Sequence, residues 1–180
     1  MHKNTFAAGL ILLLAAIANG FQSKDWVRYE SLEGRFAVLM PEQPEVNIQE
    51  GKTPSGATLV QHQAKSSDRD SLYSLGYFDL EANSSYSLDK GRDGIVSAVK
   101  GTLISEKAIS LGGNAGRELT VSAKSGDYDF FIRVRLYEIS GRVYVLQHAF
   151  TKLADSPTMS EKTTKFFDSF KVTLVNGAHS

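Results

Sequence analysis

Residues 128–151 decide the fold, and they read Tyr-Asp-Phe-Phe-Ile-Arg-Val-Arg-Leu-Tyr-Glu-Ile-Ser-Gly-Arg-Val-Tyr-Val-Leu-Gln-His-Ala-Phe-Thr. Two runs rich in β-branched and aromatic residues flank Ser140-Gly141, which is typical of the two-residue turn of a β-hairpin. A two-residue turn fixes the register, so we expect Ile139 to lie opposite Arg142.

That register sorts the hairpin side chains between two faces. One face carries Phe131, Arg133, Arg135, Tyr137, Tyr144, Leu146, His148 and Phe150. The other carries Ile132, Val134, Leu136, Val145, Gln147 and Ala149. Because apolar residues occupy both faces, we expect other elements to cover this hairpin on both sides.

Further strands are predicted before this hairpin in the chain. Alternating or continuous apolar runs occur from Trp26, at 35–40 before Pro41, and at 58–64, 71–80, 103–111 and 117–123. The turn-rich residues 66–69 separate two of these runs and predict a second hairpin.

Residues 84–100 change to a helical period. Ser84 or Ser85 is placed to cap the first turn, and Asp89 lies near its positive end. The spacing of three, four and four residues predicts one buried helical face, made of Leu88, Gly91, Ile95 and Val99.

The last predicted helix begins at Ser156 and Pro157, a cap followed by a favourable first helical residue. Its apolar face consists of Met159, Thr163, Phe166, Phe167 and Phe170. The order of the elements predicts a single α+β domain over residues 26–175, in which helices flank both faces of an antiparallel sheet.

The N-terminus predicts export. Residues 6–18 have no polar side chain, Lys3 precedes them, and Ala16-Ile17-Ala18 fits a signal peptidase site. We therefore expect a signal peptide at 1–18 and a polar linker at 19–25, with a frayed tail at 176–180. The alternative is an uncleaved membrane anchor, although the apolar run is shorter than the roughly 20 residues that span a bilayer.

Composition narrows the chemistry. The 180 residues include no cysteine, and 20 basic residues balance 20 acidic ones. Without thiols the chain has no disulfide, no thiolate metal site and no lipid anchor on cysteine, and its balanced charge argues against nucleic acid as a partner. Cleavage after Ala18 leaves 162 residues with a formal charge of −1, so we expect an extracytoplasmic protein, periplasmic or secreted.

Several local motifs resemble uncharacterised exported bacterial proteins of PsbP-like fold, an α/β/α sandwich. The motifs are Trp26-Val27-Arg28-Tyr29, the run from Glu33 to Pro41 followed by Pro44, Gly116-Arg117-Glu118, Arg133-Val134-Arg135, and Phe166-Phe167-Asp168-Ser169-Phe170. The resemblance implies an accessory or binding role within an extracytoplasmic protein complex rather than catalysis, and it assigns no functional residue.

Catalytic and metal sites find little support in the sequence. His62 and His148 lie more than eighty residues apart in separate strands, without the spacing of metal ligands. The chain has no Gly-x-Ser-x-Gly motif, and its paired aspartates at 68 and 70 and at 127 and 129 lie beside predicted turns. We expect no catalytic residue, no metal and no cofactor.

One group of residues stands out as a candidate binding site. In the predicted register Arg133, Arg135, His148 and Tyr144 share a face of the hairpin. Buried arginines require partners, so this face either holds carboxylates such as Glu118 or Asp168, or opens to an anionic ligand or partner. The sequence therefore predicts an exported binding protein, with an anionic-ligand binder or enzyme as the alternative.

Overall fold

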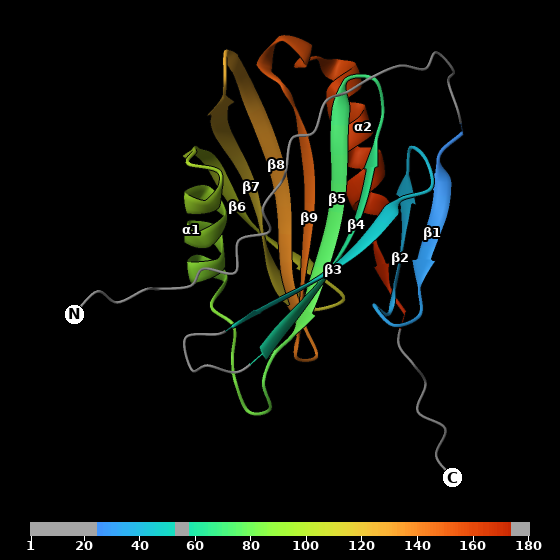
Figure 1. Ribbon diagram of the computed structural model, residues 1–180, viewed down its shortest axis with the longest axis vertical. Helices are drawn as coiled ribbons and strands as arrows, with labels where there is room; N and C mark the ends of the chain where they lie inside the picture. Colours follow the sequence, from blue (N-terminus) through green and yellow to red (C-terminus); the bar gives the residue numbers. More distant parts are fainter. Residues whose placement is uncertain (1–24, 53–57, 174–180) are drawn as a thin grey trace, which may run out of the picture.

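The computed structural model describes residues 25–52 and 58–173, and its ten strands make two antiparallel sheets (Figure 1). The smaller sheet has the order β1-β2-β10 and the larger one the order β3-β4-β5-β9-β8-β7-β6. The strands are β1 (Val27–Ser31), β2 (Phe36–Met40), β3 (Glu45–Lys52), β4 (Thr58–Ser67), β5 (Ser71–Asp79), β6 (Thr102–Leu111), β7 (Asn114–Ser125), β8 (Tyr128–Ile139), β9 (Arg142–Thr151) and β10 (Lys171–Val172). The helices are α1 (Leu88–Ala98), the short 3-10 turn η1 (Lys152–Ala154) and α2 (Pro157–Ser169).

The β8–β9 hairpin has the predicted register. Ile139 lies opposite Arg142, Arg133 opposite His148, and the pairing continues to Phe130 and Thr151. Ser140 and Gly141 have φ values of 52° and 74°, the conformation that a type I′ turn requires. Nine of the ten β9 residues are buried, so the prediction that the hairpin is covered on both faces is confirmed.

Two hydrophobic clusters occupy opposite faces of the larger sheet. The first joins α2 and β2 to the sheet, and it includes Phe36, Tyr73, Leu146, Phe166 and Phe170. The second joins Ile95 of α1 to residues of β5, β7, β8 and β9, and α1 contacts β7 and β8. The antiparallel α+β arrangement is as predicted.

Both predicted helices form, but α1 begins later in the chain than predicted. Ser156 caps α2 by accepting a hydrogen bond from Met159 N at 3.2 Å, and Met159, Thr163, Phe166 and Phe167 are buried as expected. In α1, however, the cap is Ser87, which accepts from Lys90 N at 3.3 Å, so neither Ser84 nor Ser85 fills that role. The helix begins at Leu88 because the preceding residues form a turn, in which Ser84 Oγ bonds to the Glu81 carbonyl.

Strand β3 and the separate smaller sheet were not predicted. All β3 residues from Glu45 to Glu50 are exposed, so their alternation does not mark a buried face. The smaller sheet depends on pairs far apart in the chain, such as Val172 opposite Phe36. The predictions for residues 1–18 and 176–180, and all but Asp25 of the linker, fall outside the described residues.

Candidate functional site

His148 lies in the middle of β9 with no exposed surface. Its ring stacks on Tyr73 at 4.3 Å between centroids, and Nδ1 lies 2.8 Å from Thr163 Oγ1. The Thr163 hydroxyl donates its own hydrogen to the Met159 carbonyl at 2.9 Å. This arrangement assigns the His148 proton to Nδ1, which donates to Thr163.

Burial governs the charge of His148. It lowers the pKa of the imidazole from 6.5 to about 3, which outweighs the opposing effect of Asp68. Its Nε2 atom has no hydrogen-bond partner within the described residues. His148 is therefore a neutral residue of the core.

Arg135 joins β8 to two neighbouring elements. Its Nε donates to Glu118 Oε2 of β7 at 2.6 Å, and Nη1 donates to Asp168 Oδ1 of α2 at 2.7 Å. The guanidinium also lies 5.0 Å from the centroid of the Phe167 ring. Burial alone would raise the pKa of Glu118, but the hydrogen bonds and charges of Arg135 and Lys107 together outweigh it, and the pKa lies below its ordinary value.

Arg133 is also partnered. Its Nη1 donates to Ser160 Oγ at 3.2 Å, its Nη2 lies 3.3 Å from Asp155, and its guanidinium lies 5.3 Å from the centre of the Phe150 ring. Both arginines of the candidate site therefore meet carboxylates of the chain itself. Of the two arrangements that the sequence left open, the geometry matches the first, in which carboxylates such as Glu118 and Asp168 hold the arginines.

Tyr144, the fourth candidate, lies on the same face and is 1% exposed. Its hydroxyl donates to the Gly34 carbonyl at 2.9 Å, and burial raises the pKa of the phenol. It fastens the turn between β1 and β2 to the larger sheet. The four candidates share one face of the β8–β9 hairpin, and each has a partner elsewhere in the described part of the chain.

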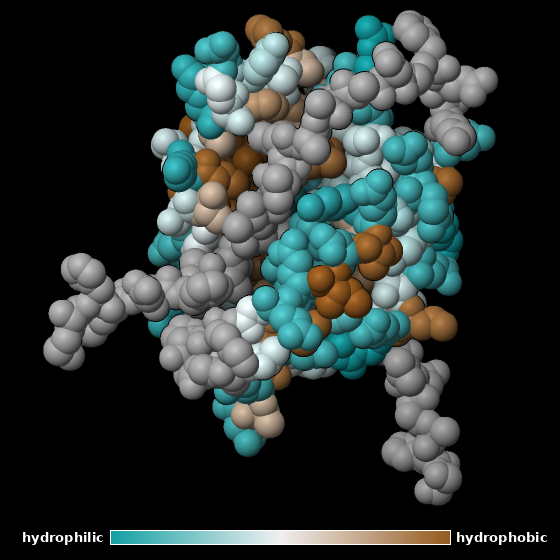
Figure 2. Space-filling model, viewed as in Figure 1, coloured by the Kyte–Doolittle hydropathy of each residue, from teal (hydrophilic) through white to brown (hydrophobic). Residues whose placement is uncertain are grey.

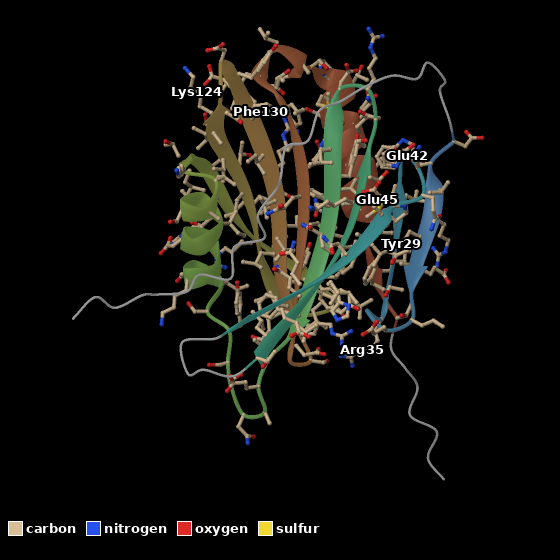
Figure 3. All side chains as sticks on the ribbon, viewed as in Figure 1. Tyr29, Arg35, Glu42, Glu45, Lys124 and Phe130 are labelled. Atoms are coloured by element: carbon tan, nitrogen blue, oxygen red, sulfur yellow. The ribbon has the colours of Figure 1, made fainter. Side chains whose placement is uncertain are left out.

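Arg142, beside the turn between β1 and β2, was not among the predicted site residues. Its Nε and Nη2 donate to the two carboxylate oxygens of Asp79 at 2.6 and 2.7 Å, and Nη1 donates to the Glu33 carbonyl at 2.5 Å. Arg35, labelled in Figure 3, lies 3.9 Å from Asp79. Only the long-range pairing of β5 with β9, which sets Asp79 opposite Arg142, could have identified this pair.

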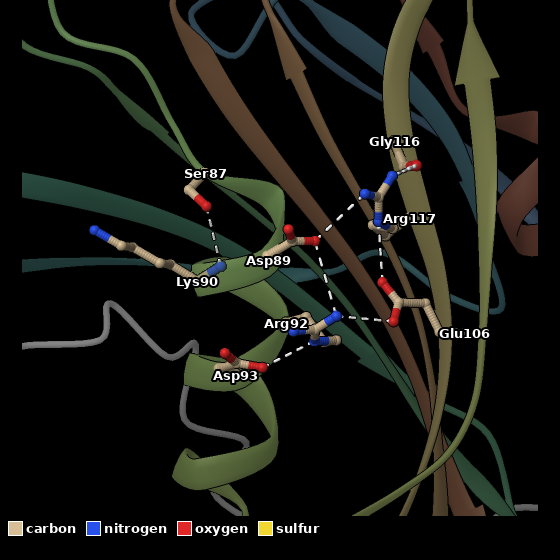
Figure 4. A network of polar contacts seen from close by, with 8 residues as sticks. All are labelled: Ser87, Asp89, Lys90, Arg92, Asp93, Glu106, Gly116 and Arg117. Atoms are coloured by element: carbon tan, nitrogen blue, oxygen red, sulfur yellow. Dashed lines mark hydrogen bonds and ion pairs between the residues drawn. The ribbon is translucent and has the colours of Figure 1, made fainter.

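A second ionic network attaches α1 to β6 and β7 (Figure 4). Arg92 of α1 lies 2.9 Å from Glu106 and 2.8 Å from Asp93, while Arg117 of β7 lies 3.0 Å from Glu106 and 3.3 Å from Asp89. Each arginine has two or more carboxylate partners. The network holds α1 in place and leaves neither guanidinium unpaired.

The opposite face of the hairpin contains a buried amide. Gln147 has no exposed surface, and neither Nε2 nor Oε1 has a hydrogen-bond partner in the described residues. Its cross-strand neighbour Ser74 accepts a hydrogen bond from Gln63 Nε2 at 3.0 Å. An unpaired buried amide costs about 1–3 kcal/mol of stability.

Two kinds of feature are absent from residues 25–52 and 58–173. No three His, Asp or Glu side chains are grouped so that they could hold a metal ion. No helix there is long and apolar enough to cross a membrane.

No protein-family model and no curated protein sequence matches the chain. Among solved structures, it is similar to the cyanobacterial PsbP (CyanoP) of Synechocystis sp. PCC 6803, with a TM-score of 0.57 and 15% identity over 88% of this chain and 98% of that one. Protein PA94 of Pseudomonas aeruginosa, of unknown function and a putative regulator, gives a TM-score of 0.44 and 14% identity over 77% and 91% of the two chains. LpqN of Mycobacterium tuberculosis, involved in cell envelope biogenesis, gives 0.42 and 11% identity over 83% and 91%.

The similarity to CyanoP extends over almost the whole of both chains, and at this level of identity it concerns the fold alone. It agrees with the arrangement described above and with the fold that the sequence motifs resemble. The chain has a PsbP-like fold.

Proposed function

We propose that this chain is an exported accessory protein that binds an extracytoplasmic partner and performs no catalysis of its own. In this proposal the α/β/α sandwich, with α1 over one face of the larger sheet and α2 over the other, is a scaffold that presents its surface to the partner. The export step rests on the signal-peptide pattern of residues 1–18.

One observation supports the non-catalytic role. The polar residues of the candidate face are already engaged within the chain: Arg133 and Arg135 with carboxylates, and His148 with Thr163 in the core. Catalytic acids and bases need access to a substrate, usually in a cleft. These side chains instead connect β8 and β9 to α2.

Export is tested on the native protein. The chain is isolated from the extracytoplasmic fraction of its host, and its first residues are sequenced. We expect the sequence to begin at Asn19. A native chain that begins at Met1 and stays in the cytoplasm would contradict the proposal.

Partner binding is tested by crosslinking in intact cells, followed by purification of the chain. The matched control lacks residues 1–18 and therefore remains inside the cell. We expect one extracytoplasmic protein to be crosslinked in near-stoichiometric amount to the exported chain and not to the control. The same adducts with both chains, or with neither, would count against an accessory role.

The alternative, an anionic ligand held by Arg133 and Arg135, is tested with inorganic phosphate. Such a ligand would have to displace Asp155, Glu118 or Asp168, so we expect phosphate to leave the melting temperature at constant ionic strength unchanged. A phosphate-dependent rise that Arg135→Met abolishes would favour the alternative.

A further inference from the structure

Strand β3 forms one edge of the larger sheet, and its outer side is unpaired among the described strands. It pairs with β4 in a continuous register from Glu45 opposite Lys65 to Lys52 opposite Thr58, without a bulge. An edge strand of this length presents a row of free backbone N–H and C=O groups. Such an edge can add a strand from another chain.

The same strand exposes apolar side chains. Val46 is 57% exposed, Ile48 56% and the neighbouring Val60 of β4 38%. On the face drawn in Figure 2, hydrophobic surface lies within the hydrophilic area where β3 crosses the molecule in Figure 1. Val46 and Ile48 are two residues apart in β3, and Val60 lies opposite Glu50, two residues further on, so all three lie on one face of the sheet.

The opposite edge, β6, is protected in ways that β3 is not. Its register with β7 is interrupted between Leu103 and Ser105, and bulges of this kind hinder the addition of a further strand. Its Glu106 and Lys107 are engaged in ion pairs with residues of α1 and β7. Between its first and last residues β3 has neither a bulge nor a lysine nor a proline.

We propose that β3 pairs antiparallel with β3 of a second copy of this chain, with Asn47 opposite Asn47 of the second copy. The two copies are then related by a two-fold axis perpendicular to the sheet, and their seven-stranded sheets pair edge to edge. Val46 lies opposite Ile48 of the second copy, and this contact occurs twice, so four apolar side chains meet on one face. Glu45 lies opposite Gln49 of the second copy, so no acidic residue faces another.

The neighbouring registers are chemically worse. Centring the pair on Ile48 would place Val46 opposite Glu50 of the second copy, twice. Centring it on Val46 would place Ile48 opposite Pro44, which has no N–H group to donate. Registers shifted by a single residue would place Val46 and Ile48 opposite residues whose side chains belong to the other face of the sheet.

The proposed interface is small, and its symmetry limits the assembly to a dimer. The proposed register pairs five β3 residues from each copy, which places the interface at the low end of specific interfaces, below about 1,200 Å² in total. We therefore expect a reversible dimer with a dissociation constant in the micromolar range. Because both copies use the same edge, the association stops at two.

The dimer is tested by sedimentation velocity on the purified chain over a range of concentrations. Ile48→Lys adds a charge to the apolar contact and should raise the dissociation constant at least tenfold. Ile104→Lys is the matched control, since Ile104 is 57% exposed on the opposite edge, and it should change nothing. A wild-type chain that stays monomeric at concentrations up to hundreds of micromolar, or equal effects of the two lysines, would overturn the proposal.

The register is tested with single cysteines, which the chain otherwise lacks. In the proposed pair the two Asn47 Cα atoms lie about 4.5–5.5 Å apart, within disulfide range, so Asn47→Cys should form a covalent dimer on mild oxidation. Gln49→Cys is the control, because its two copies would be separated by about 13 Å along the strands. No dimer from Asn47→Cys, or a faster one from Ile48→Cys or Gln49→Cys, would refute this register.

Discussion

Arg135 of β8 and Asp168 of α2 lie 33 residues apart in the chain, and their side chains meet at 2.7 Å. The same guanidinium lies over Phe167, one residue before its acidic partner. The ion pair and the ring contact both attach α2 to the larger sheet. Arg135, which the sequence predicted as part of a binding site, therefore connects β8 to α2.

The pH dependence of stability follows from His148. Its pKa is about 3 in the folded chain against 6.5 as the ordinary value, so between these pH values the unfolded chain binds one more proton. Its contribution is complete above pH 6.5 and is lost as the pH falls towards 3. Between pH 7 and pH 5 we expect His148 to account for a loss of about 2 kcal/mol in the free energy of unfolding.

The variant His148→Asn isolates this effect, because the asparagine amide can still donate to Thr163 but does not titrate. Urea unfolding at pH 7 and pH 5 should show a smaller difference in the variant than in the wild type. Phe78→Leu removes a ring from the hydrophobic cluster on the opposite face of the sheet and should lower stability equally at both pH values. An unchanged pH dependence in His148→Asn would contradict the assignment of a neutral, buried imidazole.

Gly116 of β7 has no room for a side chain. A Cβ atom there would lie 2.5 Å from Tyr137 Cδ1 and 2.7 Å from the Leu136 carbonyl oxygen. Because the carbonyl belongs to the backbone of the adjacent strand, we expect Gly116→Ala to cost about 1–3 kcal/mol in chemical denaturation. Gly51→Ala in β3, with no atom within 4 Å of the added Cβ, should change stability by less than about 0.5 kcal/mol.

Gln147 has a buried amide without a partner. Replacing it with the similarly sized methionine removes that unpaired group, and we expect the free energy of unfolding to rise by about 1 kcal/mol. Thermal and urea unfolding measure the change. A loss of stability would mean that the amide has a partner, and would mark the face beside Ser74 as a place to search for a ligand.

Arg142→Lys should weaken the attachment of the β1–β2 turn. Lysine cannot make the two parallel hydrogen bonds to Asp79 together with the third to the Glu33 carbonyl. Since Asp79 is largely exposed, we expect a moderate cost of about 1–2 kcal/mol. Arg28→Lys, in the exposed pair with Glu30, is the control and should stay within about 0.5 kcal/mol.

Local patterns predicted much of this fold. The Ser140-Gly141 turn fixed the register of β8 and β9, and the spacing of Met159, Thr163 and Phe166 identified the buried face of α2. In each case the residues that determine the element lie within it or directly beside it in the chain. The face shared by Arg133, Arg135, His148 and Tyr144 was predictable for the same reason.

Features set by distant residues were not predictable in this way. The turn after β1 is held by Tyr144, 110 residues away, and β10 adds only two residues to the smaller sheet. In the sequence Arg142 is simply the residue after the Ser140-Gly141 turn. It meets its partner Asp79 only when β5 and β9 align. Strand β3 was not predicted because it buries little, with all residues from Glu45 to Glu50 exposed.

The central claim, that the arginines of the candidate face serve the fold, is tested most directly by a double-mutant cycle on Arg135→Met and Asp168→Asn. Both single variants and the double variant are unfolded in urea at constant ionic strength. We predict that each single change lowers stability and that the coupling energy is about 0.5–1 kcal/mol, as for a partly exposed pair. Single variants as stable as the wild type, with no coupling between them, would show that Arg135 is free for another role and would contradict the account.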